Sequence, residues 1–190
     1  MGLYSVAKFF LFRGIGDVRA KNPEANSYGT ALNAACSSGS LEVARLTIDA
    51  GADGNAMAGE HWLPLNQAMK ACSGRDGPPD FRLVLIERGA DINIITPDGQ
   101  WPLNFAVGIH SIEGINLYLE AGADPSLRDN IGFSVFETAV LLRQSQVFEV
   151  LRQYGAGRHT NPEFPLSESP RACAAYKLML ASAPNFYNSA

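Results

Sequence analysis

The sequence predicts an all-α solenoid, a stack of about four helix-turn-helix repeats, and two recurring motifs carry that prediction. The tripeptide Gly-Ala-Asp stands at 51–53, 89–91 and 122–124, with Gly155-Ala156 as a weaker fourth copy. A helix-opening tetrapeptide recurs as Thr30–Asn33, Leu63–Asn66, Trp101–Asn104 and, in a degraded form, Ser134–Glu137. Each unit therefore offers a helix start and an outward turn at matching places.

The spacing of the helix openings is nearly constant. Leu32 and Leu65 are 33 residues apart, and so are Leu103 and Phe136. The interval from Leu65 to Leu103 is 38 residues, and the five extra residues fall in Ser73–Pro79. Glycine and proline in that stretch exclude regular structure, so we expect a surface loop there.

The first part of the chain is less regular. Tyr4–Arg13 is expected to form a helix that Gly14 ends, because glycine adopts the left-handed conformation of a helix C-terminus. The polar stretch 17–28 is expected to be a loop. The regular pattern starts at Thr30, whose hydroxyl can cap a short helix over 31–37.

Caps and apolar spacing predict the later helices. Residues 41–49 carry apolar side chains at helical spacing, and Pro64 opens the next unit in a first helical turn, where its missing amide hydrogen costs no hydrogen bond. The polar residues 158–167 are expected to be a linker. Pro170 after a serine then predicts a last helix over 171–181.

A period of 33 with these turns resembles the ankyrin repeat. The turn matches well as Gly51-Ala52-Asp53-Gly54-Asn55 and Gly89-Ala90-Asp91-Ile92-Asn93. The helix opening is drifted from the family's Thr-Pro-Leu-His, with asparagine in the histidine position at Asn33, Asn66 and Asn104 and with Leu63 and Trp101 in the threonine position. The resemblance covers roughly residues 29–157. The drift of the helix-opening motif is expected to affect capping and stability more than the fold.

The resemblance also implies a domain organisation. Residues 1–158 would form an ankyrin-like array that begins with a worn half-repeat, and residues 159–190 would form a linker, a C-terminal capping helix and a frayed tail. Because stacking leaves the apolar face of the last repeat uncovered, a closing helix is the expected solution.

Composition and charge argue against several functions. The chain has 15 Lys and Arg against 19 Asp and Glu, a formal charge of −4, without a long run of either sign. Nucleic-acid and anionic-membrane binders need clustered basic residues, so neither partner is expected. The apolar stretch Leu3–Phe12 contains Lys8 and is too short to span a bilayer. We therefore expect a soluble, cytoplasmic protein.

The side chains that could carry chemistry do not converge. Three widely spaced cysteines, Cys36, Cys72 and Cys173, are expected to be reduced thiols. The histidines lie apart in the chain, at His61, His110 and His159. The repeated aspartates, Asp53, Asp91 and Asp124, are expected to accept backbone hydrogen bonds in their turns rather than to bind calcium. The sequence thus predicts no enzyme, no metal site and no cofactor.

The resemblance implies that turn tips and exposed sides of the first helices line a concave recognition face. We expect this face to bind another protein, as an adaptor, an inhibitor or an effector. The predicted partner-binding residues are Met57, Glu60, Trp62, Ile95, Asp98, Gln100, Ile109, Arg128, Ile131 and Phe133. The same face would include Asn26, Ser27, Ser37, Ser38, Lys70, Asn130, Leu141 and Leu142.

Within that set, Met57, Trp62, Ile109, Ile131 and Phe133 are the expected anchors, because large apolar side chains carry most of the energy of an interface. Glu60, Asp98 and Arg128 would orient the partner. Alternatively, Trp62 and Phe133 cover the hairpins, and Leu141 and Leu142 belong to the terminal core.

Two other functions remain open. One is a structural or regulatory subunit that self-associates through the fourth repeat and the last helix. We expect the chain itself to be a monomer or a weak homodimer. The other is an enzyme or small-ligand protein that uses His159, Glu163 or Tyr176. The Ser73–Pro79 loop is either a second contact region or an idle insertion.

Overall fold

The computed structural model describes residues 17–19, 29–57, 62–72, 80–130 and 132–155. Those residues contain eight α-helices. The chain divides into two compact units, Met1–Pro102 and Leu103–Ala190, here called the N-terminal and C-terminal units. The predicted first helix, the Ser73–Pro79 loop and the predicted linker and last helix lie outside the described residues.

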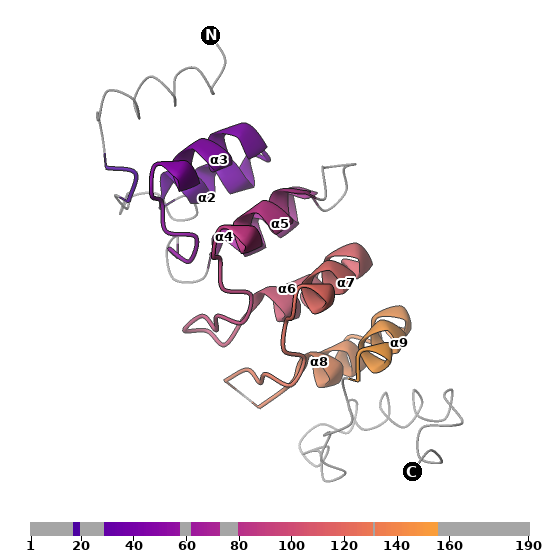
Figure 1. The fold of residues 1–190 in the computed structure, drawn as a ribbon. Helices are drawn as coiled ribbons and strands as arrows, with labels where there is room; N and C mark the ends of the chain where they lie inside the picture. Colours follow the sequence, from indigo (N-terminus) through magenta and orange to yellow (C-terminus); the bar gives the residue numbers. More distant parts are fainter. Residues whose placement is uncertain (1–16, 20–28, 58–61, 73–79, 131, 156–190) are drawn as a thin grey trace, which may run out of the picture. The chain divides into compact units, whose positions relative to one another are not determined.

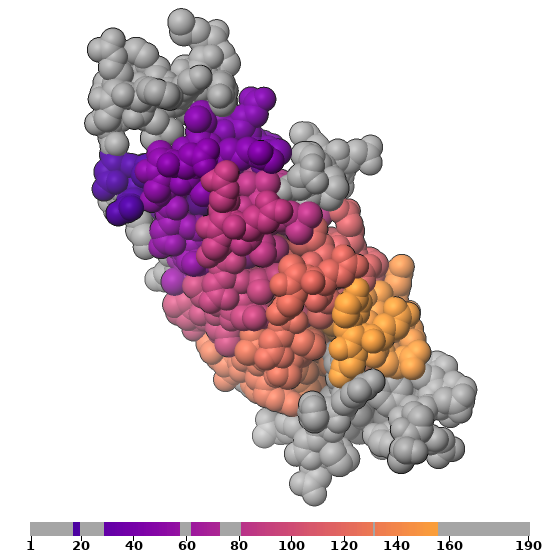
Figure 2. Space-filling model, viewed as in Figure 1, coloured from indigo at the N-terminus to yellow at the C-terminus, as the bar shows by residue number. Residues whose placement is uncertain are grey.

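The described part of the N-terminal unit contains four helices, which are arranged in pairs (Figure 1). The helices are α2 (Ala31–Ser37), α3 (Leu41–Asp49), α4 (Pro64–Cys72) and α5 (Asp80–Glu87). Helix α2 packs against both α3 and α4, and α4 packs against α5. The helices predicted over 31–37 and 41–49 are confirmed at those bounds. Figure 2 shows that neighbouring parts of the described chain in this unit lie in close contact on the surface.

The C-terminal unit repeats this arrangement with α6 (Pro102–Gly108), α7 (Ile112–Glu120), α8 (Val135–Leu141) and α9 (Ser145–Gln153). Helix α9 packs against both α7 and α8. The core of the C-terminal unit includes Phe136 and Phe148, whose ring centroids are 4.6 Å apart in a tilted arrangement. Ile115 and Tyr118 are also fully buried. Burial of these large side chains is the main stabilising contribution in a repeat of this size.

The first helices differ in the residue that stands directly before them, at the capping position. Thr30 accepts a hydrogen bond from Asn33 N at 3.1 Å, as a helix cap should. Leu63 and Trp101 occupy the same position and are buried instead. Trp101 is 0% exposed, so this side chain belongs to the core. The drift of the motif thus replaces a capping hydrogen bond with apolar burial and leaves the helix start unchanged.

The turns after the second helices confirm the predicted role of the aspartates. Asp53 Oδ1 accepts from Asn55 N at 2.9 Å, and Asp91 Oδ1 accepts from Asn93 N at 2.8 Å. Asp124 Oδ1 accepts from the backbone N of the residue two positions later at 2.8 Å. The glycines that start these turns have φ between 90° and 91°, a conformation that favours glycine.

Candidate functional site

Hydrogen bonds fix the tip of the loop that follows α5. Thr96 N donates to Gln100 O at 2.7 Å, and Gly99 N donates to Thr96 O at 2.8 Å. Gln100 N donates to Thr96 Oγ1 at 3.0 Å, and the Thr96 hydroxyl also contacts the Asp98 carboxylate. The Thr96 side chain is buried, whereas the neighbouring Ile95 is 43% exposed. A rigid turn therefore presents one large apolar side chain to solvent.

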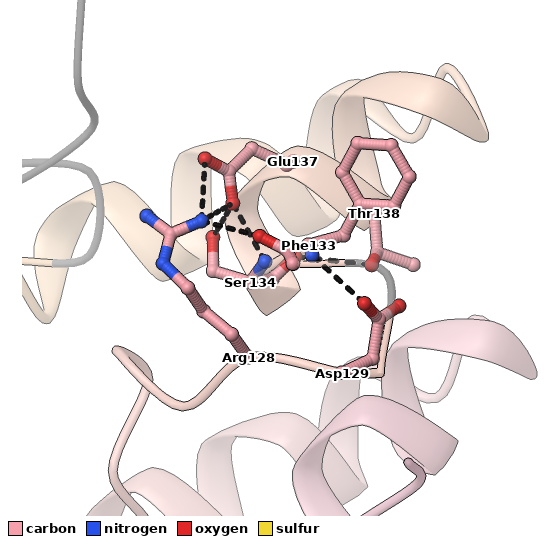
Figure 3. Close-up of polar contacts among 7 residues, drawn as sticks. Arg128, Asp129, Phe133, Ser134, Glu137 and Thr138 are labelled. Atoms are coloured by element: carbon pink, nitrogen blue, oxygen red, sulfur yellow. Dashed lines mark hydrogen bonds and ion pairs between the residues drawn. The ribbon is translucent and has the colours of Figure 1, made fainter. Parts of the chain in front are cut away.

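The same turn recurs 33 residues later, in the loop between α7 and α8 (Figure 3). Asp129 N donates to Phe133 O at 2.9 Å, and Gly132 N donates to Asp129 O at 3.0 Å. Phe133 N donates to Asp129 Oδ1 at 2.8 Å. Asp129 thus replaces Thr96 as the turn acceptor, and Gly132 replaces Gly99.

This register places the predicted site residues in two sets of equivalent positions. One set, eight residues before the conserved helix-opening position of each unit, comprises Met57, Ile95 and Arg128. The other, directly before the helix cap, comprises Trp62, Gln100 and Phe133. Ile95, Gln100 and Arg128 are exposed, whereas Met57, Trp62 and Phe133 are half-buried. Half-burial leaves only part of the surface of these three residues for contact with a partner.

Arg128 forms contacts within its own hairpin. Its Nη1 donates to Gly132 O at 2.6 Å and lies 3.2 Å from Glu137 Oε2 (Figure 3). The Glu137 carboxylate is 2% exposed and also accepts from Ser134 N at 2.6 Å and from the Ser134 hydroxyl. Because a buried carboxylate needs such partners, Arg128 stabilises the start of α8. If Arg128 also orients a partner, as predicted, its guanidinium must bind that partner while it contacts Gly132 and Glu137.

Trp62 is held by a cation–π contact. The Lys70 ammonium nitrogen lies 5.0 Å from the Trp62 ring centroid. Lys70 is exposed near the end of α4, and Trp62 precedes that helix. The contact holds the ring beside Lys70 of the helix, and Trp62 as a whole is half-buried.

The loop that carries Met57 is attached to the helix before it. Asn33 is fully buried in α2, and its Nδ2 donates to Ala56 O at 2.7 Å and to Thr30 Oγ1 at 3.0 Å. Asparagine in the histidine position thus joins its own helix cap to the backbone beside Met57. A second link follows from Asn55, whose Oδ1 accepts from Asp91 N at 2.7 Å.

The end of α6 presents a second exposed apolar side chain. Ile109 is 37% exposed directly after the helix. His110 follows in the left-handed region with φ 59°, and its N donates to Val107 O at 3.0 Å. Ser111 N donates to Ala106 O at 3.0 Å and closes the turn. This pair of hydrogen bonds requires the left-handed residue at its centre.

The end of α8 repeats that geometry. Leu142 is 50% exposed, and Arg143 follows with φ 56°. Arg143 N donates to Val140 O at 3.0 Å, and Gln144 N donates to Ala139 O at 2.9 Å. The corresponding residue after α2 is a glycine, Gly39, with φ 69°. In the C-terminal unit, therefore, two bulky side chains occupy a position that suits glycine.

The other predicted residues divide into two groups. Ser38, Asp98, Asn130 and Leu142 are exposed, and Ser37 and Leu141 are half-buried. A second group lies outside the described residues: Asn26, Ser27, Glu60, His61, Ile131, His159, Glu163, Cys173 and Tyr176. The predicted roles of the second group therefore stay predictions.

The structure describes two of the three cysteines and the surroundings of other residues that could bind a metal. Cys36 and Cys72 are both reduced thiols, Cys36 buried in α2 and Cys72 half-buried at the end of α4. Burial raises the pKa of the Cys36 thiol well above its usual range, so Cys36 stays protonated and unreactive at neutral pH. Among the described residues, no three His, Cys, Asp or Glu side chains gather as metal ligands would.

One turn of the array lies in the stretch that the sequence suggested was only a loop. Asp17 Oδ1 accepts from Arg19 N at 2.8 Å, which is the contact of the later aspartate turns. Arg19 Nε donates to Gly51 O at 2.9 Å, as Asn55 Nδ2 donates to Gly89 O at 3.5 Å. The signal was available, because Asp17 precedes Arg19 as Asp53 precedes Asn55. Arginine in place of asparagine concealed it.

No helix among the described residues is long and apolar enough to cross a membrane. No protein-family model matches the chain. The ankyrin repeat and LEM domain-containing protein 1 homolog of Caenorhabditis elegans is 33% identical over 84 residues, which are 44% of this chain and 11% of that protein. The chain therefore matches only a small part of that relative's length. With the helices described above, this match shows that the chain resembles ankyrin-repeat proteins over a segment and has an all-α, ankyrin-like repeat fold.

Proposed function

We propose that this chain is a non-catalytic module that binds a partner protein through its hairpin tips and the exposed ends of its first helices. Proteins with ankyrin repeats generally mediate protein interactions and are generally not enzymes, and the partial match to such a protein supports the proposal. The proposal includes no cofactor. An adaptor, an inhibitor and an effector would all use such a surface in this way.

One observation carries the proposal: where the exposed apolar side chains lie. Among the described residues, five large apolar side chains are exposed, and three of them are Ile95, Ile109 and Leu142. Ile95 lies at a hairpin tip, and the other two lie at first-helix ends. All three follow or precede turns that hydrogen bonds fix. Rigid, exposed apolar side chains suit an interface because little conformational entropy is lost when they are buried.

The half-buried aromatic residues would complete the surface. Trp62 and Phe133 precede first helices, and both residues are half-buried. The proposal assigns them edge contacts rather than the central anchor positions. Glu60 and Ile131 are assigned to the same surface from their places in the sequence alone.

Affinity capture with quantitative mass spectrometry tests the proposal. The full chain and three variants, Ile95→Asp, Ile109→Asp and Leu142→Asp, would be used as baits in a native lysate. Leu83→Asp is a matched control, because Leu83 in α5 is 37% exposed, as Ile109 is, but lies on a second helix.

The proposal predicts that a specific partner is captured by the full chain and by Leu83→Asp, and is depleted with at least one of the three site variants. Circular dichroism and thermal unfolding check that each variant is folded. A partner retained equally by every folded site variant would contradict the proposed surface. A partner lost only with Leu83→Asp would move the interface to the second helices.

A further inference from the structure

Two loops of the C-terminal unit share one unusual feature. Ile109-His110 after α6 and Leu142-Arg143 after α8 each place an exposed aliphatic residue before a large polar residue with a left-handed backbone. These are the two non-glycine residues with positive φ in the described part of the chain. Because left-handed backbone disfavours side chains with a Cβ, glycine would be the stable choice at both positions.

Within the described residues, these polar side chains form no contact that offsets the unfavourable backbone conformation. His110 and Arg143 are both exposed, and neither has a side-chain hydrogen bond or ion pair within the residues that the structure describes. Residues kept in unfavourable backbone conformations without a structural partner often serve binding. The equivalent position after α2 holds Gly39, so a glycine can occupy this position of the turn.

The spacing of the two loops follows from helix packing. Helix α9 packs against α7 and α8, so the two helix pairs stack within this unit. Helix pairs stacked through α7 and α9 repeat at about one helix diameter, so we expect the two equivalent loops to be about 10 Å apart. On a helical partner, side chains seven positions apart lie on one face at about 10 Å, and in a polyproline II segment side chains three positions apart lie on one side at about 9 Å.

The charge of the two loops indicates the charge of the partner segment. Residues 109–111 and 142–144 contain one arginine, one histidine and no carboxylate. A guanidinium binds carboxylates in a bidentate geometry, and an imidazole N–H donates to a carboxylate or a carbonyl oxygen. A basic partner would meet Arg143 as a like charge, whereas an acidic one would be attracted.

We propose that Ile109, His110, Leu142 and Arg143 form one binding strip for an acidic amphipathic segment of another protein. Two apolar side chains of that segment, one repeat apart, would contact Ile109 and Leu142, and a carboxylate would bind Arg143. This inference rests on the proposed function and names the chemistry of the partner for the C-terminal unit.

A peptide-display selection on the full chain tests the inference. A library of random 16-residue peptides would be selected against the chain, and enriched peptides would be synthesised and their affinities measured. We expect peptides with two apolar residues at i and i+7 or i and i+3 and at least one Asp or Glu. Their binding should weaken about ten-fold or more with Leu142→Ala or with Arg143→Glu.

An exchange of charge between Arg143 and the acidic residue of the peptide tests the ion pair directly. Peptides whose acidic residue is changed to lysine should bind Arg143→Glu better than they bind the original chain. Arg143→Gly should lose the preference for acidic peptides while it keeps the fold, because glycine suits the left-handed backbone. Leu83→Ala is the matched control and should bind every peptide unchanged.

Each remaining outcome contradicts the inference in a recognisable way. Selected peptides that depend on Ile95 but not on Ile109 or Leu142 would overturn the inference and leave the proposed function standing. Peptides without an acidic preference would overturn the charge assignment. No peptide dependent on any of the three residues would count against both. Light scattering that shows a dimer lost with Leu142→Ala would assign the strip to a second copy of the chain.

Discussion

Arg128 Nη1 lies 3.2 Å from Glu137 Oε2, and this ion pair joins the hairpin to the first turn of α8. The arginine side chain is 44% exposed, whereas the carboxylate is almost completely buried. The two partners are therefore unequal: removal of the arginine leaves a buried charge, and removal of the carboxylate leaves a cation that water can solvate.

Arg128→Ala should therefore destabilise the chain by about 1–2 kcal/mol, a value at the low end because solvent screens the exposed guanidinium. Urea denaturation followed by circular dichroism measures the change. Arg152→Ala is the matched control, because it breaks an ion pair with Glu149 that is exposed on both sides. The control should cost less than about 0.5 kcal/mol. Equal costs for the two variants would show that the buried Glu137 does not depend on Arg128.

His110→Gly and Arg143→Gly should each stabilise the fold by about 1 kcal/mol, because glycine removes the unfavourable left-handed conformation. Thermal unfolding of the single variants measures the gain. Gly39→Ala, at the equivalent position after α2, should instead destabilise by about 1 kcal/mol. If both glycine variants melted at lower temperature than the original chain, the side chains of His110 and Arg143 would have a structural role.

Cys36 gives the folding stability a defined dependence on pH. Burial holds the pKa of its folded-state thiol above the unfolded value of about 8.5. Below pH 8.5 the thiol is neutral in both states, and its contribution to stability is fully present. Above that pH only the unfolded state loses the proton, so stability falls by about 1.4 kcal/mol per pH unit.

Comparison with Cys36→Ala isolates this contribution from other groups that titrate at high pH. The difference in unfolding free energy between the original chain and Cys36→Ala should be constant from pH 7 to 8 and should shrink from pH 9 to 10. Denaturation series at these pH values measure it. Curves that stay parallel up to pH 10 would mean that Cys36 ionises in the folded state as well.

Much of the fold could be predicted because it depends on neighbours in sequence. The bounds of α2 and α3 follow from a cap, a glycine and apolar spacing. The hydrogen bonds of Asp53 and Asp91 span two residues, so a recurring tripeptide is enough to predict them. Local chemistry of this kind is repeated in every unit.

The features that could not be predicted from the sequence depend mostly on contacts between residues distant in the chain. Trp101 differs from its counterparts at the helix openings, and no local pattern shows that tertiary packing buries it completely. Arg128 contacts Glu137 nine residues away, and no local pattern separates this from a free, partner-binding arginine. Arg19 reaches Gly51 across 32 residues. The left-handed conformations of His110 and Arg143 were concealed because the sequence places side chains where glycine is expected.

The affinity of a captured partner for Ile109→Asp and Leu142→Asp, each compared with Leu83→Asp by isothermal titration calorimetry, tests the account most directly. Ile109 and Leu83 have the same exposed fraction, so an aspartate perturbs water contact equally at both positions. The account predicts that both site variants weaken binding at least about ten-fold, whereas Leu83→Asp leaves the Kd unchanged. Unchanged binding by the two folded site variants would contradict recognition through the ends of the first helices.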